Sequence, residues 1–229
     1  SLDNGVQQNL FSGEAQVSRD GRFVVFTRGT GTGPGATLAD KAISGGEICF
    51  RDMQGNVLLC VTKGPGGAAP NGASAKPSVS ADGGKLVYES TASNIAGTTD
   101  GNGTVSDIFA YTKSTNTTQL VSNTSSGAAA TAASNSPHLS CNGNNIVFES
   151  LAPLLGSGAT TGIRNIYAGS FSGGGKRLVS RGLSNANANG DSRNARISDD
   201  GRYVFFESVA TNLVAGDSNG RSDVFVHDN

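Results

Sequence analysis

The apolar residues of this chain come in short runs that recur in one order. Four segments share a Ser, then Asp or Asn followed by Gly, then a run of apolar residues; they begin at Ser18, Ser80, Ser140 and Ser198. Their Asp or Asn positions, 20, 82, 142 and 200, are 62, 60 and 58 residues apart. Because Asp-Gly and Asn-Gly between apolar runs favour hairpin turns, each segment predicts two strands joined by a tight turn.

Further apolar segments follow each hairpin. The first set lies at residues 47–50, 107–111, 165–168 and 223–226, and a second set, at 57–62, 119–122 and 177–180, occurs only in the first three repeats. The second strands, such as Phe23–Phe26 and Tyr203–Phe206, are apolar throughout rather than alternating. That pattern predicts sheets that are covered on both faces.

These features together predict an all-β fold, a β-propeller of four-stranded antiparallel blades. It has four repeats of about 58–62 residues, and the last blade lacks its outer strand. A β-sandwich of unrelated strands does not explain why the same turn and apolar run recur in one order. We expect residues 1–229 to form a single propeller domain or a propeller fragment, with blades at approximately 10–62, 70–122, 132–180 and 190–229.

The residue pattern of the repeat also resembles that of a known family. The segments 197–208 and 210–228 resemble the TolB-like β-propeller repeats of bacterial periplasmic and secreted proteins, and the second repeat keeps most of the pattern from Pro77 to Phe109. The resemblance covers nearly the whole chain. It implies the propeller fold and a role in binding or scaffolding with diverse partners, and it implies no particular activity.

Composition narrows the class of protein. The formal net charge is −1, only 15% of residues are charged, and there are 33 glycines. A near-neutral chain without a basic stripe argues against nucleic acid as a partner. No run approaches the roughly 20 apolar residues of a membrane helix, so no membrane insertion is expected. The start at Ser1 has no signal-peptide features, so we expect any signal peptide to have been removed, and a secreted, extracellular or periplasmic location.

The three cysteines cannot all pair within one chain. If Gln54-Gly55 is a two-residue hairpin turn, Cys49 lies directly opposite Cys60. Two interpretations are then open: a disulfide, or two free buried thiols. The register predicts a hydrogen-bonded pair of residues, whose wider spacing suits a disulfide less well. Cys141 is interpreted as a packed or turn residue.

Two loops carry Asp and Asn before a Gly, the arrangement by which calcium loops gather oxygen ligands. They contain Asp217, Asn219 and Asp223, and in a looser copy Asp100, Asn102 and Asp107. Both loops lack the further acidic ligands of an EF-hand, and Asp and Asn before Gly are also ordinary turn residues. Calcium binding and a purely structural turn are therefore both kept, and no other cofactor is predicted.

The sequence motifs that could indicate catalysis are weak evidence for it. Gly216–Gly220 matches the letters of a hydrolase nucleophile elbow but is expected between strands, where that motif does not function. Glu89, Glu149 and Glu207 share one repeat position, which favours a structural role over an unlike pair of catalytic carboxylates. His138 occupies a variable position of an inner strand, which can face the central channel, and it is interpreted as a polar residue with satisfied hydrogen bonds rather than as a catalytic base.

The sequence therefore predicts a non-catalytic, extracellular or periplasmic propeller module. We expect it to bind a protein or a surface polymer through the face that carries the long loops. The alternative is a structural or assembly protein that forms homo-oligomers or filaments when a neighbouring strand completes the open blade. A propeller hydrolase is the less favoured third hypothesis.

Overall fold

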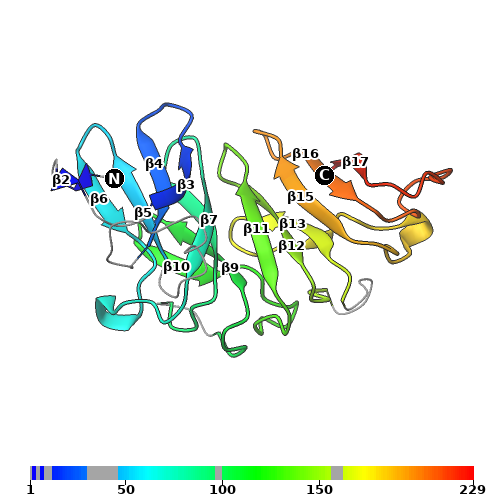
Figure 1. The fold of residues 1–229 in the computed structure, drawn as a ribbon, viewed down its shortest axis with the longest axis horizontal. Coiled ribbons are helices and arrows are strands. Elements are labelled where there is room, and N and C mark those ends of the chain that lie inside the picture. The colour runs from blue at the N-terminus through cyan, green and yellow to red at the C-terminus, as the bar shows by residue number, and fades with distance from the viewer. Residues whose placement is uncertain (1, 4–5, 8–11, 30–45, 96–99, 156–161) are drawn as a thin grey trace.

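The computed structural model describes residues 2–3, 6–7, 12–29, 46–95, 100–155 and 162–229. Its strands form one short hairpin, β1 (Leu2–Asp3) with β2 (Val6–Gln7), and four antiparallel sheets that we call blades 1 to 4 (Figure 1). Blade 1 consists of β3 (Ser12–Val17), β4 (Phe23–Arg28), β5 (Glu47–Asp52) and β6 (Val57–Cys60). Blade 2 consists of β7 (Ser74–Val79), β8 (Lys85–Ser90), β9 (Asp107–Thr112) and β10 (Thr117–Leu120).

Blades 3 and 4 repeat the same order. Blade 3 consists of β11 (Ser134–Leu139), β12 (Asn145–Ser150), β13 (Asn165–Ser170) and β14 (Arg177–Leu178). Blade 4 has only β15 (Ser192–Ile197), β16 (Tyr203–Ser208) and β17 (Asp223–Asp228). The predicted set of antiparallel sheets, with a shorter last one, is thus confirmed. Two 3-10 turns, η2 (Pro65–Gly67) and η3 (Leu183–Asn185), lie in blade-joining connections. Within the described ranges, no helix could cross a membrane.

The tight turns between the first two strands of each blade have one design. In blade 1, the Ser18 hydroxyl donates to Asp20 Oδ1 at 2.5 Å and accepts the Phe23 N–H at 2.9 Å. Gly21 has a φ of +72°, a conformation that residues with a Cβ adopt only with strain. The Ser18 hydroxyl and the Arg22 N–H also hold the pKa of Asp20 below its usual range. The recurring Ser, Asp and Gly therefore build the turn itself.

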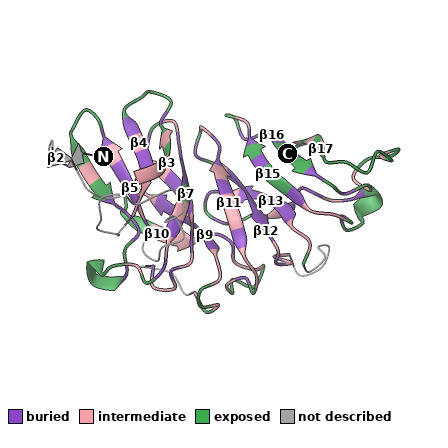
Figure 2. Ribbon diagram, in the orientation of Figure 1, coloured by how far each residue is buried: buried purple, intermediate pink, exposed green. Residues whose placement is uncertain are grey.

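The core lies between blades, as the continuously apolar strands predict. Each described interface joins one face of a blade to the next blade. Figure 2 shows buried residues along the strands of blades 2 and 3. Val25 and Ile48 of blade 1 pack in one cluster with Tyr88 and Phe109 of blade 2, and all four are fully buried. Two similar clusters join blade 2 to blade 3 and blade 3 to blade 4.

The outer strands end earlier than the sequence predicts. The apolar segment 119–122 lies only partly in β10, because pairing stops at Leu120. Beyond that point, the Val121 N–H donates to the carbonyl of Ile108, and the Ser122 hydroxyl accepts the Ile108 N–H. A side-chain oxygen thus replaces the next ladder bond, which explains why each outer segment ends in Ser or Thr.

Cys49 and Cys60 lie opposite each other on β5 and β6 and form a disulfide. The expected two-residue turn is wrong: residues 53–56 form a four-residue turn. The Cα atoms of the cysteines are 4.0 Å apart, close to the spacing of a non-hydrogen-bonded pair. The longer turn shifts the alternation of ladder bonds by one pair, so the spacing no longer opposes a disulfide.

Candidate binding site in the central channel

The inner strand of every blade carries a β-bulge near its start. The pairing register shifts after the second residue of β3, β7, β11 and β15. The residue at each shift has a positive φ although it is not glycine: Glu14, Lys76, Ser136 and Asn194, with φ between 48° and 57°. A bulge re-aims the side chains that follow it, and here those side chains face the channel between the blades.

A carboxylate from the preceding blade fixes three of these bulges. The Ser136 N–H donates to Glu89 Oε2 at 2.7 Å, and the Asn194 N–H donates to Glu149 Oε1 at 2.8 Å. Between blades 1 and 2, Glu14 takes this role, and its Oε2 accepts the Lys76 N–H at 2.9 Å. The glutamates that share one repeat position therefore serve, at positions 89 and 149, as links between blades.

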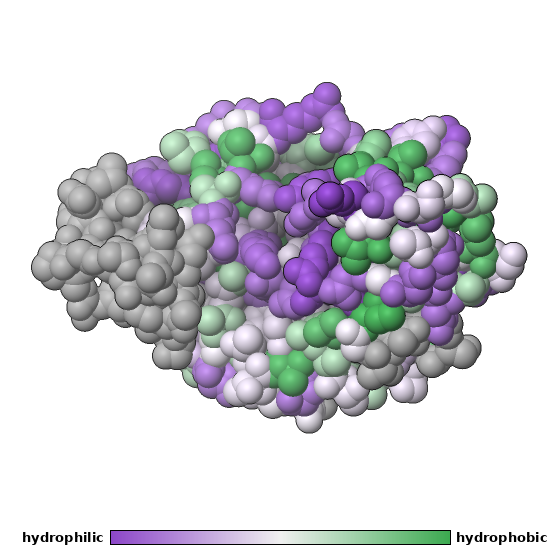
Figure 3. Space-filling view, turned by 45° about the vertical axis from the view of Figure 1, so that its right-hand side comes forward, coloured by the Kyte–Doolittle hydropathy of each residue, from purple (hydrophilic) through white to green (hydrophobic). Residues whose placement is uncertain are grey.

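The four inner strands line an open cavity of about 340 Å³. Figure 3 shows mainly hydrophilic side chains around a hollow in the middle of the molecule. Its lining combines charged and amide side chains with two prolines: Glu14, Ala15, Gln16, Lys76, Pro77, Ser136, Pro137, His138, Asn194 and Arg196. Since the bulges lie near the strand starts, the cavity lies toward the end of the blades where the blade-joining connections enter.

The cavity lining combines the carboxylate of Glu14 with two cationic side chains, Lys76 and Arg196, of which Arg196 has no ion-pair partner among the described residues. Within the described residues, Arg196 forms no salt bridge, and its guanidinium donates only to the carbonyl of Ala195 at 2.9 Å. Lys76, by contrast, has Glu89 Oε1 3.4 Å away. Burial, with a smaller contribution from Arg196, lowers the pKa of His138 to about 4, so its imidazole is neutral at pH 7. The buried Nδ1 of His138 has no hydrogen-bond partner. This arrangement can accept an anionic group at Arg196.

The sequence predicted part of this site. The channel was one position considered for His138, and its side chain lines the cavity, but the satisfied hydrogen bonding expected of it is not found at Nδ1. The bulges were not predicted, although Pro77 and Pro137 carried a signal, since proline within a strand is confined to edges and bulges. The four bulge residues are of different types, so no shared residue in the sequence indicates their common backbone conformation.

The loops considered for calcium have an internal hydrogen-bond pattern. The Asn102 amide nitrogen donates to Asp107 Oδ2 at 2.6 Å, and that of Asn219 donates to Asp223 Oδ2 at 3.0 Å. Asp107 is fully buried, and burial raises the pKa of its carboxyl group. In each loop, buried side-chain oxygens lack a hydrogen-bond partner, namely Asp100 Oδ2, Asn102 Oδ1 and Asp217 Oδ1. Asp100, Asn102 and Asp107 thus meet in one loop, as do Asn219 and Asp223 in the other, and calcium stays a prediction.

Two other groups of residues are explained by local chemistry. Glu47 lies near Cys49 and Cys60 in a cluster of metal-ligand type, but both sulfurs are used in the disulfide. The Cys141 thiol lies 2.9 Å from Asp199 Oδ1. This hydrogen bond and partial burial raise the pKa of Cys141, which disfavours the reactive thiolate.

Comparison with solved structures identifies the fold. TolB from Acinetobacter baumannii superposes with a TM-score of 0.53 at 16% identity, over 96% of this chain and 41% of the TolB chain. Putative TolB from Agrobacterium tumefaciens gives 0.51 at 17% identity, over 97% of this chain and 78% of that one. An oligogalacturonate lyase from Vibrio parahaemolyticus gives 0.53 at 10% identity, over 96% and 55%.

These likenesses show a TolB-like propeller fold, as the repeat predicts. This chain spans less than half the length of the Acinetobacter TolB chain. No family model and no curated protein matches the sequence. Because TolB proteins and a lyase share the fold, the fold by itself does not assign an activity.

Proposed function

We propose that this chain is a protein-binding propeller module of the periplasm or the extracellular space. It binds an acidic segment of a partner protein at the central channel. The observation that carries this proposal is the unpaired guanidinium of Arg196 beside the neutral His138 in a cavity of about 340 Å³. A rigid scaffold of packed strands that presents a charged cavity near its loops suits recognition of a partner's side chains or terminus.

Several features support binding rather than catalysis. Glu89 and Glu149 accept backbone N–H groups of the neighbouring blade, which leaves them poorly placed for proton transfer. The low pKa of His138 and the raised pKa of Cys141 oppose roles as general base and nucleophile at neutral pH. The Cys49–Cys60 disulfide is typical of an oxidising compartment, in line with a secreted or periplasmic protein.

A pair of charge reversals on one strand tests the proposal. Arg196 lines the cavity, whereas Arg193 lies outside its lining and pairs with Asp191 at 2.8 Å. Immobilised wild-type chain and the variants Arg196→Glu and Arg193→Glu are exposed to the secreted and periplasmic fractions of the producing organism. Bound proteins are then quantified by mass spectrometry.

We expect a protein that the wild type and Arg193→Glu retain and that Arg196→Glu loses. Equal retention by both variants would show that the channel does not bind the partner. Circular dichroism and the melting temperature of each variant separate lost binding from lost folding.

A further inference from the structure

Blade 1 differs from blades 2 and 3 in one pair of facing residues on its third and fourth strands. Cys49 of β5 lies opposite Cys60 of β6. In the other two blades, an aromatic residue and a leucine occupy the same positions: Phe109 with Leu120, and Tyr167 with Leu178. Two sulfurs in blade 1 thus replace an apolar pair that packs in the core of its neighbours.

A carboxylate lies beside the two sulfurs. Glu47 is two residues before Cys49 on β5, so both side chains leave the same face of the strand. A carboxylate oxygen of Glu47 and the sulfurs of Cys49 and Cys60 all lie within 4.8 Å of one another. The equivalent residue in blade 2, Asp107, is one carbon shorter, and its Oδ1 accepts the Ser122 hydroxyl at 2.6 Å instead. Among the four described blades, only blade 1 therefore gathers two sulfurs and a carboxylate.

The surroundings of this cluster suit a set of metal ligands. Cys49 is fully buried and Cys60 is 9% exposed, and both belong to a small apolar cluster with Phe26. The Glu47 side chain is 13% exposed, and its Oε2 accepts a hydrogen bond from the Arg28 guanidinium at 2.6 Å. A hydrogen-bond partner of this kind fixes the orientation of a ligating carboxylate, and an apolar shell limits the access of solvent.

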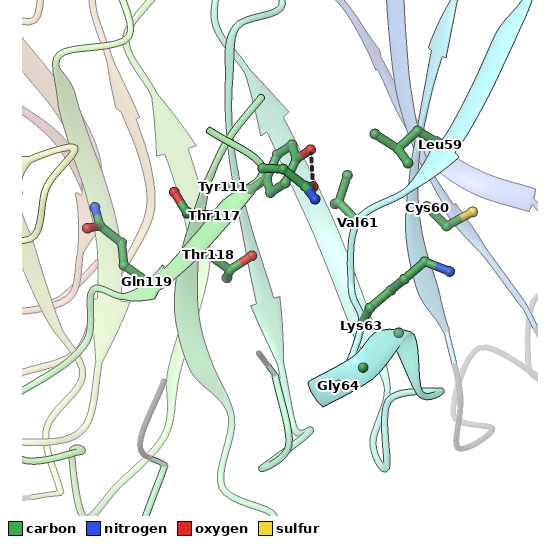
Figure 4. A pocket seen from close by; sticks show the side chains of 12 residues that line it. Leu59, Cys60, Val61, Lys63, Gly64, Tyr111, Thr117, Thr118 and Gln119 are labelled. Atoms are coloured by element: carbon green, nitrogen blue, oxygen red, sulfur yellow. Dashed lines mark hydrogen bonds between the residues drawn. The ribbon is translucent and has the colours of Figure 1, made fainter. Parts of the chain in front are cut away.

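The cluster is separate from the groove between blades 1 and 2. That groove has a volume of about 560 Å³, and Leu59 and Val61 line it on the side of blade 1. In Figure 4, these two side chains point toward the groove, and the Cys60 sulfur points the other way. The three candidate ligands therefore lie on the face of blade 1 that is turned away from blade 2.

The disulfide prevents both sulfurs from binding a metal as thiolates. A dithiol reductant removes this obstacle: it transfers two electrons and two protons to the S–S bond and becomes a disulfide itself, and Cys49 and Cys60 become thiols. A divalent cation that binds them then displaces both thiol protons into solvent. The reduced chain thus offers two thiolates and the carboxylate of Glu47.

This ligand set favours zinc. Thiolates disfavour the hard cations calcium and magnesium, and Zn²⁺ accepts sulfur and carboxylate ligands together. Ligand atoms of tetrahedral zinc lie about 3.6 to 3.8 Å apart. The side chains of Glu47, Cys49 and Cys60 reach that spacing through small rotamer changes, because their ligand atoms already lie within 4.8 Å of one another.

We propose that Glu47, Cys49 and Cys60 form a zinc site in the reduced chain. A water molecule occupies the fourth position of the tetrahedron. Zinc and the disulfide exclude each other, so the redox state of the cysteine pair determines whether blade 1 holds the metal. In an oxidising compartment the disulfide is the expected state, and zinc binding then requires a dithiol reductant. The site lies outside the lining of the central channel and does not depend on the function proposed there.

The test uses cobalt(II) as a spectroscopic probe, because its absorption reports thiolate ligands and tetrahedral geometry. The full chain is reduced with a phosphine, freed of it by gel filtration without oxygen, and titrated with cobalt(II) and then with zinc. We expect thiolate-to-cobalt and tetrahedral bands that saturate at one metal per chain and that zinc abolishes. The oxidised chain should show no such bands, and diamide, which oxidises the thiols, should release the zinc.

Four variants separate the three-ligand site from a bare pair of thiols. Glu47→Gln should weaken zinc binding by roughly tenfold or more, since the loss of even an outer partner of a zinc ligand has an effect of that size. Cys60→Ser should bind no zinc. The controls are Glu207→Gln, at an exposed carboxylate of blade 4, and Cys141→Ser, at the free cysteine, and both should bind zinc as the wild type does.

Circular dichroism of each reduced protein shows whether the β-sheet spectrum is retained. Four results would overturn the proposal: no metal bands in the reduced wild type, bands that persist in Cys60→Ser, equal zinc affinity of Glu47→Gln and wild type, or loss of the β-sheet spectrum when the disulfide is reduced. Equal zinc affinity would show that the thiolates bind the metal without Glu47.

Discussion

Burial keeps the imidazole of His138 neutral at pH values where a free histidine carries a proton. Its pKa falls from 6.5 to about 4, first because of desolvation and second because of Arg196. Between these two values, the unfolded chain binds a proton that the folded chain does not. The contribution of His138 to stability is therefore complete above pH 6.5 and is lost as the pH falls toward 4.

This difference can be measured with His138→Gln, which cannot titrate. Between pH 7.5 and pH 4, the wild type should lose on the order of 3 kcal/mol more of its free energy of unfolding than the variant. Urea unfolding followed by circular dichroism gives both values. Parallel losses in the two proteins would mean that His138 titrates normally and is not buried beside the channel.

At the scale of strands and blades, the glutamates of one repeat position have unequal roles. Glu149 is 5% exposed; it accepts the N–H of Asn194 and lies 3.3 Å from the Arg164 guanidinium. Glu207, at the same position of blade 4, is exposed, and among the described residues it accepts only from the Asn194 side-chain amide. The chain thus supplies its own matched control.

We expect Glu149→Gln to lower the free energy of unfolding by about 2 to 3 kcal/mol, because it weakens a charged hydrogen bond and leaves Arg164 without its partner. Glu207→Gln should change it by less than about 0.5 kcal/mol, as is usual for exposed positions. Chemical unfolding of both variants measures the difference. Equal effects would show that Glu149 does not link blades 3 and 4.

The elements that recur in the sequence could be predicted from it, and those fixed by a neighbouring blade could not. The tight turns follow from Ser18, Asp20 and Gly21 and their repeats, since these residues make the turn's own hydrogen bonds. The bulge at Asn194 depends on Glu149, 45 residues earlier, so no local pattern records it. The turn before Cys60 had the predicted register but a different length.

The candidate site, too, could be predicted from the sequence only in part. The direction of His138 followed from its repeat position, whereas the neutrality of its ring depends on burial, which only packing reveals. Arg177 of blade 3 and His227 of blade 4 line one groove, and the sequence alone does not show that they share a surface.

At the scale of the whole molecule, blade 4 differs from blade 3 in the apolar side chains that stay exposed. Phe205, Val224 and Val226 are 45%, 75% and 61% exposed, although the equivalent Val147, Ile166 and Ala168 of blade 3 are fully buried against blade 4 (Figure 2). Within the described residues, the outer side of blade 4 is therefore more exposed than the equivalent side of blade 3, which packs on its neighbour.

The central claim is that the channel binds a protein partner, and site-specific photocrosslinking tests it most directly. A photoreactive amino acid replaces either Gln16, which lines the cavity, or Thr115, which is exposed on the outer hairpin of blade 2. After irradiation in the secreted and periplasmic fractions, mass spectrometry identifies the adducts. We predict that a protein crosslinks from position 16 and not from position 115, and that Arg196→Glu abolishes the adduct. Adducts from position 115 alone, or adducts at position 16 that Arg196→Glu leaves unchanged, would contradict a binding channel.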